Sequence, residues 1–232
     1  MALTDTALRL DPDNARCLAL GARCRIHYKV RGWVPPTHPC IAEGGRMGRR
    51  AALHAPNDSE VLWMAGIAVV LAGGDVPGGI ALIDRALAIN PNSVEALTYS
   101  GMARAYAGDA DTALQHLARA TQLSPVDAQT YNKQTAGAWA TFGVGRYEGC
   151  LAWTEQALAS KLDYAPPWRL RAASFGLLGR LEEGKEAVLR LLALSPDETC
   201  ASSRIYYTPT YLAPGAVDAM VEGLRRAGLP EG

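Results

Sequence analysis

A proline recurs along the chain at intervals near 34 residues, each time directly after a helical run rich in alanine and leucine. These prolines are Pro12, Pro56, Pro91, Pro125 and Pro196, which lie 44, 35, 34 and 71 residues apart. The last interval holds a degenerate copy with Leu162 in the proline position, so it divides into 37 and 34 residues. Proline lacks a backbone N–H and disfavours helix in the preceding residue, so each one ends a helix. A repeat of this length predicts stacked units that share one core.

The range 92–125 shows the repeat in full. Its landmark residues are Leu97, Gly101, Ala113, Leu117, Ala120 and Pro125. The pattern resembles the tetratricopeptide repeat (TPR), W-x2-L-G-x2-Y, then A-x3-F, then A, then P. The resemblance implies two antiparallel helices per unit, A and B, whose small residues let the backbones approach closely. Glycines predict the turns between A and B, at Gly108, Gly145 and Gly179.

We therefore predict an all-α TPR solenoid, a right-handed superhelix of antiparallel helix pairs with a C-terminal capping helix. The predicted divisions are an orphan helix B at 1–12, TPR-like units at 13–56, 57–91, 92–125, 126–162 and 163–196, and an extension with the capping helix at 197–232. Two units exceed the period. The ten extra residues of 13–56 are placed in the A–B turn at 29–40, and the three of 126–162 are expected to lengthen helix A.

The orphan helix at the start of the chain bears on self-association. By the phase of the repeat, Leu3, Leu8 and Leu10 should lean onto the next unit, which leaves Thr4 and Ala7 on the bare side. So little apolar area gives a small drive for burial, and a monomer is favoured over a homodimer.

A narrower resemblance rests on the stretches YAPPWRLRAASFGLLGRLEEGKEAVLRLLALSP and VEGLRRAGLPE, together with RGW at 31–33 and the proline-rich loop after it. They resemble the C-terminal TPR segment of bacterial signalling proteins that carry an adenylate/guanylate cyclase-like or winged-helix domain. The resemblance implies the regulatory part of such a system. No cyclase signature or winged helix fits this chain, so neither activity is carried over.

The charge balance and the cysteines limit the partners and the compartment. The 23 basic and 23 acidic residues cancel, whereas a generic nucleic-acid binder is basic, so no nucleic-acid partner is expected. An excess of +5 over 1–54, densest at Arg46, Arg49 and Arg50, indicates a solvated helix face or, alternatively, an acidic partner or head-to-tail attraction between chains. The longest apolar run, about 64–72, is too short to span a bilayer, so no membrane partner is expected. With no signal peptide visible and five cysteines without framework spacing, the sequence predicts a cytoplasmic protein with reduced thiols.

Catalytic and metal-binding patterns are absent from the sequence. It contains no GxxxxGK[ST], GxGxxG, GxSxG, HExxH or CxxC, so we predict neither an enzyme nor a cofactor. The one candidate metal cluster is Cys24, His27, His38 and Cys40, for which ordinary packing is the favoured interpretation. Cys150 falls in a small-residue position, which predicts a buried, inert thiol.

What remains is the concave face that exposed residues of successive A helices form in a TPR superhelix. The predicted partner-binding residues are Arg23, Trp63, Ile67, Met102, Tyr106, Trp139, Phe142 and Arg169. This largely aromatic and apolar stripe, with arginine at its ends, suits an extended or helical peptide, although packing between helices explains part of it as well. We predict a protein-protein interaction module with a peptide or protein partner. The alternatives are a small-molecule-sensing regulatory domain and a structural oligomerisation module.

Overall fold

The computed structural model describes residues 2–72 and 74–232, and all regular structure in these ranges is helical. Five helix pairs follow one another, α2 (Ala15–Val30) with α3 (Pro39–His54), α4 (Ser59–Leu71) with α5 (Val76–Ile89), α6 (Val94–Ala107) with α7 (Ala110–Leu123), α8 (Thr130–Gly143) with α9 (Tyr147–Ser160), and α10 (Ala165–Leu177) with α11 (Leu181–Leu194). Helix α1 (Ala2–Leu10) precedes them, and α12 (Cys200–Tyr207) and α13 (Ala216–Arg226) follow. The chain forms two compact units, residues 1–103 (unit 1) and 104–232 (unit 2), and each is described by itself.

The predicted turns between A and B helices are confirmed. Gly108, Gly145 and Gly179 adopt φ of +86°, +76° and +75°, the left-handed region in which a side chain is strained. Side chains cap several of the helix starts. The carboxylate of Asp58 accepts the N–H groups of Glu60 and Val61 at the start of α4, which satisfies two otherwise unpaired donors.

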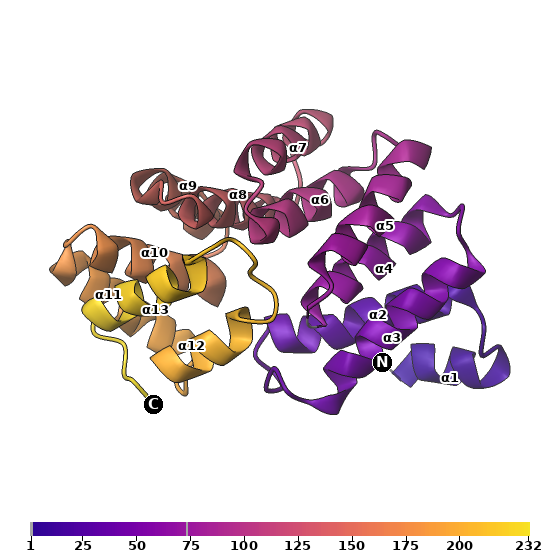
Figure 1. The fold of residues 1–232 in the computed structure, drawn as a ribbon, viewed down its shortest axis with the longest axis horizontal. Helices are drawn as coiled ribbons and strands as arrows, with labels where there is room; N and C mark the ends of the chain where they lie inside the picture. The colour runs from indigo at the N-terminus through magenta and orange to yellow at the C-terminus, as the bar shows by residue number, and fades with distance from the viewer. Residues whose placement is uncertain (1, 73) are drawn as a thin grey trace. The chain divides into compact units, whose positions relative to one another are not determined.

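In unit 1 the pairs α2/α3 and α4/α5 stack side by side (Figure 1), and α2 also packs on α4. Glycines permit the close approach of α4 and α5. A Cβ on Gly66 would lie 2.7 Å from the carbonyl oxygen of Gly79, and one on Gly79 would lie 2.6 Å from the carbonyl oxygen of Gly66. These positions carry the small residues of the repeat, so the predicted reason for their size is confirmed.

The extra residues of the two longer units are placed differently from the prediction. In the first, α2 and α3 have 16 residues each and a loop at 31–38 joins them, so the insertion lengthens both helices as well as the turn. In the unit at 126–162, helix α8 has only 14 residues; one of the extra residues lies in the turn at 144–146 and two lie in the connection at 124–129. There Lys133 donates to the carbonyl of Ser124 and pairs with Asp127 at 3.0 Å, which fixes the connection outside the helix.

The predicted orientation of the first helix is wrong. Leu3 and Leu10 are 88% and 86% exposed, whereas Thr4 is buried. The ion pair between Arg25 of α2 and Asp5 of α1, at 2.9 Å, holds α1 with its Thr4 side inward. The bare side of α1 therefore presents two leucines rather than the small polar surface that was expected.

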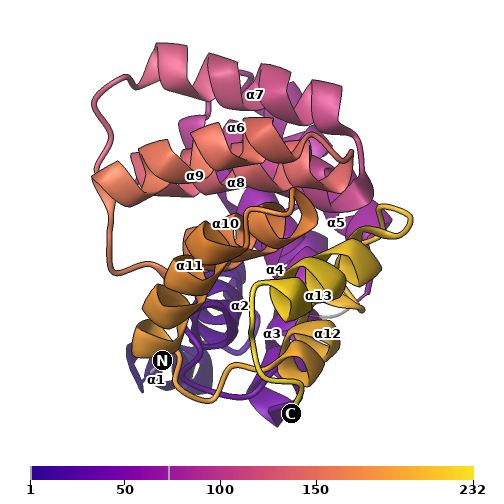
Figure 2. The same ribbon diagram turned by 90° about the vertical axis from the view of Figure 1, so that its left-hand side faces the viewer.

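In unit 2, α8 to α11 stack in the same way and α13 lies along α10 (Figure 2). The contact is backbone to backbone, since a Cβ on Gly176 would lie 2.0 Å from the carbonyl oxygen of Gly223. The predicted capping helix is thus present. Helix α12 was missed, and it is tied to the chain end by the N–H groups of Cys200 and Ala201, which donate to the carbonyls of Pro230 and Glu231. None of the described helices combines the length and the apolar character that a bilayer crossing needs.

Candidate functional site

The first helices of the pairs form one surface in each unit, here called the A-helix face. In unit 1 it belongs to α2, α4 and the part of α6 up to residue 103; in unit 2 it belongs to the end of α6, α8 and α10. The predicted partner-binding residues divide evenly, with Arg23, Trp63, Ile67 and Met102 in unit 1 and Tyr106, Trp139, Phe142 and Arg169 in unit 2.

In unit 1 two of these residues, Arg23 and Trp63, meet at a pair of stacked rings. The ring centroids of Trp63 and Tyr99 are 5.1 Å apart and their planes differ by 9°. The guanidinium carbon of Arg23 lies 5.1 Å from the Trp63 ring and 5.9 Å from the Tyr99 ring, a cation–π arrangement. The indole N–H of Trp63 donates to Glu60 at 2.8 Å, which fixes the orientation of the ring.

Two further basic side chains of α2 are perturbed by their surroundings. Burial, together with the charges of Arg23 and Arg31, lowers the pKa of His27 to about 4, so its imidazole is neutral at physiological pH. Burial also lowers the pKa of Lys29 to about 8. The Lys29 ammonium donates to the carbonyl oxygen of Leu71 at 2.8 Å and so binds the end of α4.

In unit 2 the A-helix face is covered by the chain's own C-terminal segment, residues 198–213. Trp139 contacts Tyr207 and Tyr211, with ring centroids 4.8 and 5.1 Å apart, and Tyr106 contacts Tyr211 at 5.5 Å. The Tyr211 hydroxyl donates to the carbonyl oxygen of Trp139, and the Leu212 N–H donates to that of Tyr106, both at 2.8 Å. Burial raises the pKa of Tyr106 and Tyr211 well above the ordinary tyrosine value, as expected in such a desolvated cluster.

An ion pair closes the other end of this contact. The guanidinium of Arg169 binds both carboxylate oxygens of Glu198, with Nε to Oε1 at 2.8 Å and Nη2 to Oε2 at 2.5 Å. Its third nitrogen, Nη1, donates to the Tyr207 hydroxyl at 2.8 Å. Although burial acts in the opposite direction, the Arg169 charge and its hydrogen bonds hold the pKa of Glu198 below the usual range. The pair is therefore charged and fully bonded, which is what a buried ion pair requires.

The predicted exposure of the stripe is corrected by these contacts. Trp63, Ile67, Tyr106, Trp139, Phe142 and Arg169 are all buried, and only Arg23 and Met102 are partly exposed. In unit 2 the C-terminal segment contacts Tyr106, Trp139 and Arg169, and Phe142 packs against Tyr147. In unit 1 Trp63 is stacked on Tyr99. The part of these residues in binding a partner remains a prediction.

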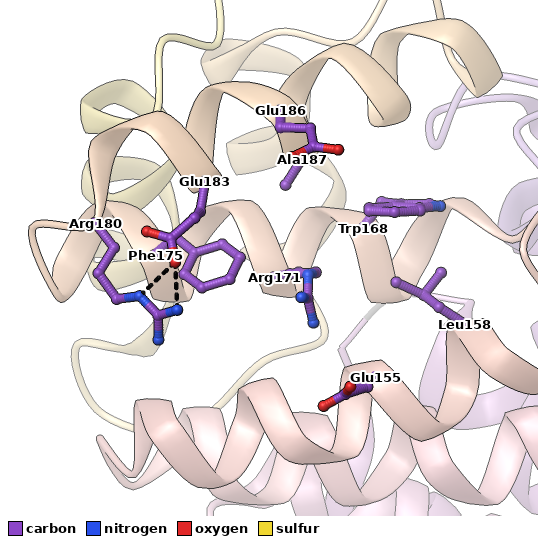
Figure 3. A pocket seen from close by; sticks show the side chains of 9 residues that line it. All are labelled: Glu155, Leu158, Trp168, Arg171, Phe175, Arg180, Glu183, Glu186 and Ala187. Atoms are coloured by element: carbon purple, nitrogen blue, oxygen red, sulfur yellow. Dashed lines mark hydrogen bonds and ion pairs between the residues drawn. The ribbon is translucent and has the colours of Figure 1, made fainter.

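A groove of about 250 Å³ lies on another surface of unit 2, between α9, α10 and α11 (Figure 3). Trp168 and Phe175 line it from α10, and Leu158 and Ala187 extend the apolar wall. The guanidinium groups of Arg171 and Arg180 lie 4.9 and 4.6 Å from the Phe175 ring. Arg180 also pairs with Glu183, so much of the charge around the groove is internally compensated.

One member of the candidate metal cluster, His38, has a structural role. In the described ranges no three His, Cys, Asp or Glu side chains are arranged to hold a metal ion. His38 caps α3, since its Nδ1 accepts the N–H of Cys40 at 3.2 Å. Cys150 is fully buried as predicted, and burial raises the pKa of its thiol to about 12.

The basic residues of the N-terminal stretch are paired. Arg46 pairs with Glu43, Arg49 with Asp75 at 2.9 Å, and Arg50 with Asp13. These exposed ion pairs fit a solvated helix face, the first of the interpretations that the sequence allowed.

Comparisons with known proteins identify the fold. No protein-family model matches the chain, and neither does any curated protein. Solved structures do match. One is PilW, described as a widely conserved type IV pilus biogenesis factor; it has 13% sequence identity and a TM-score of 0.61, and the match covers 87% of this chain and 90% of PilW. PilF of Pseudomonas aeruginosa has 11% identity, a TM-score of 0.59 and coverage of 90% and 89%; MamA of MSR-1 has 22% identity, a TM-score of 0.50 and coverage of 77% and 97%.

The fold is that of a TPR solenoid. At these identities the likeness concerns the fold alone. The narrower resemblance to cyclase-like or winged-helix signalling proteins receives no support from the comparisons.

Proposed function

We propose that this TPR chain is a protein-interaction module that binds a peptide segment on its A-helix face. The observation that carries the proposal is the docking of residues 198–213 on unit 2. Tyr106, Trp139 and Arg169, three of the predicted partner-binding residues, bind this segment through ring contacts, backbone hydrogen bonds and a bidentate ion pair. An A-helix face of this chain is thus chemically suited to hold a peptide, and stacked aromatic and arginine side chains are the usual anchors of such contacts.

Unit 1 carries the same side-chain types, and among its own described residues no segment corresponding to 198–213 binds them. Arg23, which lies over the Trp63 and Tyr99 stack, and Met102, which follows Tyr99 by three residues on α6, are both partly exposed. We therefore place the binding of an external partner on the A-helix face of unit 1. A bacterial signalling context for that partner rests only on the narrower sequence resemblance.

The test selects peptides from a phage library of random twelve-residue sequences on the immobilised protein. Met102→Glu should abolish the recovery of the selected peptides, because it places a charge in the apolar part of the face. The matched control is Leu53→Glu on α3, where the leucine is 80% exposed and lies outside the A-helix face. Recovery that is absent in the wild type, or equally reduced by both substitutions, contradicts the proposal.

An oligomerisation role is the second candidate, because α1 exposes Leu3 and Leu10. The oligomeric state in solution tests this role.

A further inference from the structure

We propose that Arg23 is an anchor for a carboxylate, so that the partner segment of unit 1 is acidic, with an Asp or Glu side chain placed against the Trp63 and Tyr99 stack. This inference rests on the proposed peptide-binding function and specifies its ligand.

Arg23 has no counter-ion among the described residues, whereas most of the other arginines of unit 1 have one. Five of them pair with a carboxylate: Arg16 with Asp58, Arg25 with Asp5, Arg46 with Glu43, Arg49 with Asp75 and Arg50 with Asp13. In the ranges 2–72 and 74–232, no hydrogen bond or ion pair involves Arg23, and its Nε is buried without a partner. A buried N–H donor without an acceptor carries a desolvation cost, so the unpaired Nε of Arg23 calls for an explanation.

The rings of Trp63 and Tyr99 offset part of that cost and fix the geometry. A guanidinium stacked on an aromatic face keeps its nitrogen edge free, and this edge matches the two oxygens of a carboxylate. The terminal nitrogens of Arg23 are not buried, so a ligand from solvent can reach them. Because Arg23 is held before the ligand arrives, less side-chain entropy is lost on binding.

The surroundings of Arg23 favour an anion. Arg31 and His27 lie further along the same helix, and the charges of Arg23 and Arg31 contribute to the low pKa of His27. Glu60, the nearest acidic residue described at the stack, is engaged by the indole N–H of Trp63. A bound carboxylate would offset the charge of Arg23, which forms no ion pair among the described residues, whereas a cationic or purely apolar segment would not.

Unit 2 contains a related arrangement, in which the ring beside the arginine belongs to the docked segment and not to the A-helix face. Arg169 lies 5.6 Å from the ring of Tyr207 and binds Glu198 through two nitrogens, and Glu198 belongs to the segment docked on the A-helix face. The chain thus shows how an aromatic-stacked arginine of this face receives a glutamate from a docked segment. At Arg23 the arginine and the rings are present, and the glutamate must come from the partner.

The test uses the phage library of random twelve-residue peptides with three forms of the protein. Wild type should select peptides with Asp or Glu enriched at one position. Arg23→Glu should reverse the preference at that position to Lys or Arg, and the control Arg46→Glu, an exposed α3 position, should keep the acidic preference. Arg23→Gln should weaken a selected acidic peptide by roughly tenfold to a hundredfold, since charged hydrogen bonds are lost. Circular dichroism checks that each variant is folded.

A second readout does not depend on any variant. Saturation with a selected acidic peptide should raise the pKa of His27, followed by NMR, because the carboxylate offsets the Arg23 charge. Selected peptides without an acidic preference, or an unchanged affinity in Arg23→Gln, overturn the carboxylate assignment and leave peptide binding intact. A library that yields no peptide overturns the proposed function, and the assignment with it.

Discussion

Replacement of Glu198 by glutamine should release the C-terminal segment from the A-helix face of unit 2. The substitution keeps the size of the side chain and removes its charge. It leaves the guanidinium of Arg169, whose side chain is only 11% exposed, without a counter-ion in a desolvated site. Either the segment undocks and water solvates the Arg169 charge, or the charge stays buried without a counter-ion and lowers the stability of the protein.

The size of the effect follows from the bonds that Glu198 makes. Its carboxylate accepts two hydrogen bonds from Arg169 and one from the Ser203 hydroxyl at 2.6 Å. Loss of one partner of a buried ion pair costs about 3–5 kcal/mol. Because the glutamine oxygen still accepts a hydrogen bond, we expect the lower end, about 3 kcal/mol.

Two measurements test this expectation. Urea unfolding gives the overall loss of stability, and hydrogen exchange at the Leu212 amide, which donates to the carbonyl of Tyr106, reports the docking of the segment directly. The matched control is Glu182→Gln, whose exposed partner is Lys185, and it should change stability by less than about 0.5 kcal/mol. If Glu198→Gln costs no more than this control and leaves Leu212 protected, the ion pair does not hold the segment and the reasoning is refuted.

The pH dependence of stability tests the same ion pair between Arg169 and Glu198. The pKa of Glu198 is lower in the folded protein than its ordinary value of 4.5. A depressed carboxyl pKa stabilises the fold above the unfolded value, and this stabilisation is lost as the pH falls through the folded value. Wild type should therefore lose more stability on acidification below 4.5 than Glu198→Gln does.

Three further predictions test packing, burial and association. Gly176→Ala should destabilise the protein by about 1–3 kcal/mol in urea unfolding, because α13 must shift to make room for the added Cβ. The helical control Gly149→Ala, whose Cβ meets nothing closer than 3.6 Å, should increase the stability by up to about 1 kcal/mol. Equal effects of the two substitutions would contradict the close contact of α10 and α13. Burial lowers the pKa of Lys29 from 10.5 to about 8, so between these pH values the unfolded chain binds more protons than the folded protein. The free energy of unfolding should therefore rise by about 2 kcal/mol from pH 7.5 to 9.5 in the wild type, and Lys29→Met should abolish this rise. An equal rise in Lys29→Met would disprove the assignment. Light scattering after size exclusion should show a monomer, because a contact made by two exposed leucines would bury little area. A dimer that dissociates in the double variant Leu3→Glu/Leu10→Glu would overturn this expectation and favour the oligomerisation role.

The features that the sequence predicted depend on local chemistry. A proline after a helix, a left-handed glycine at Gly108 and small residues at Gly66 and Gly79 each act within one repeat, so their spacing is readable along the chain. The docking of residues 198–213 could not be read in this way. Tyr211 meets Trp139 across 72 positions, and no periodicity marks such a partner. The only available signal was the cluster of tyrosines at 206–211, whose amphipathic rings need both an apolar wall and a hydrogen bond.

The prediction of the orientation of α1 failed for a related reason. The phase of the repeat assumes that a helix B packs as it does within a complete unit. An ion pair between Asp5 and Arg25 instead sets the rotation of this helix, and it places Leu3 and Leu10 outward. Because α1 packs mainly on α2, one specific polar contact can decide its orientation.

The energy of the docked segment also decides which A-helix face suits an external partner. If the Glu198 pair alone contributes about 3 kcal/mol to docking, the face of unit 2 is open in fewer than roughly 1% of molecules, and a competitor binds there at least about a hundredfold more weakly than to an open face. At Arg23 the terminal nitrogens reach solvent and no bond of the guanidinium has to be broken first. An acidic segment of equal intrinsic affinity for both arginines would therefore occupy Arg23 first, and it would reach Arg169 only where Glu198 has been displaced or replaced.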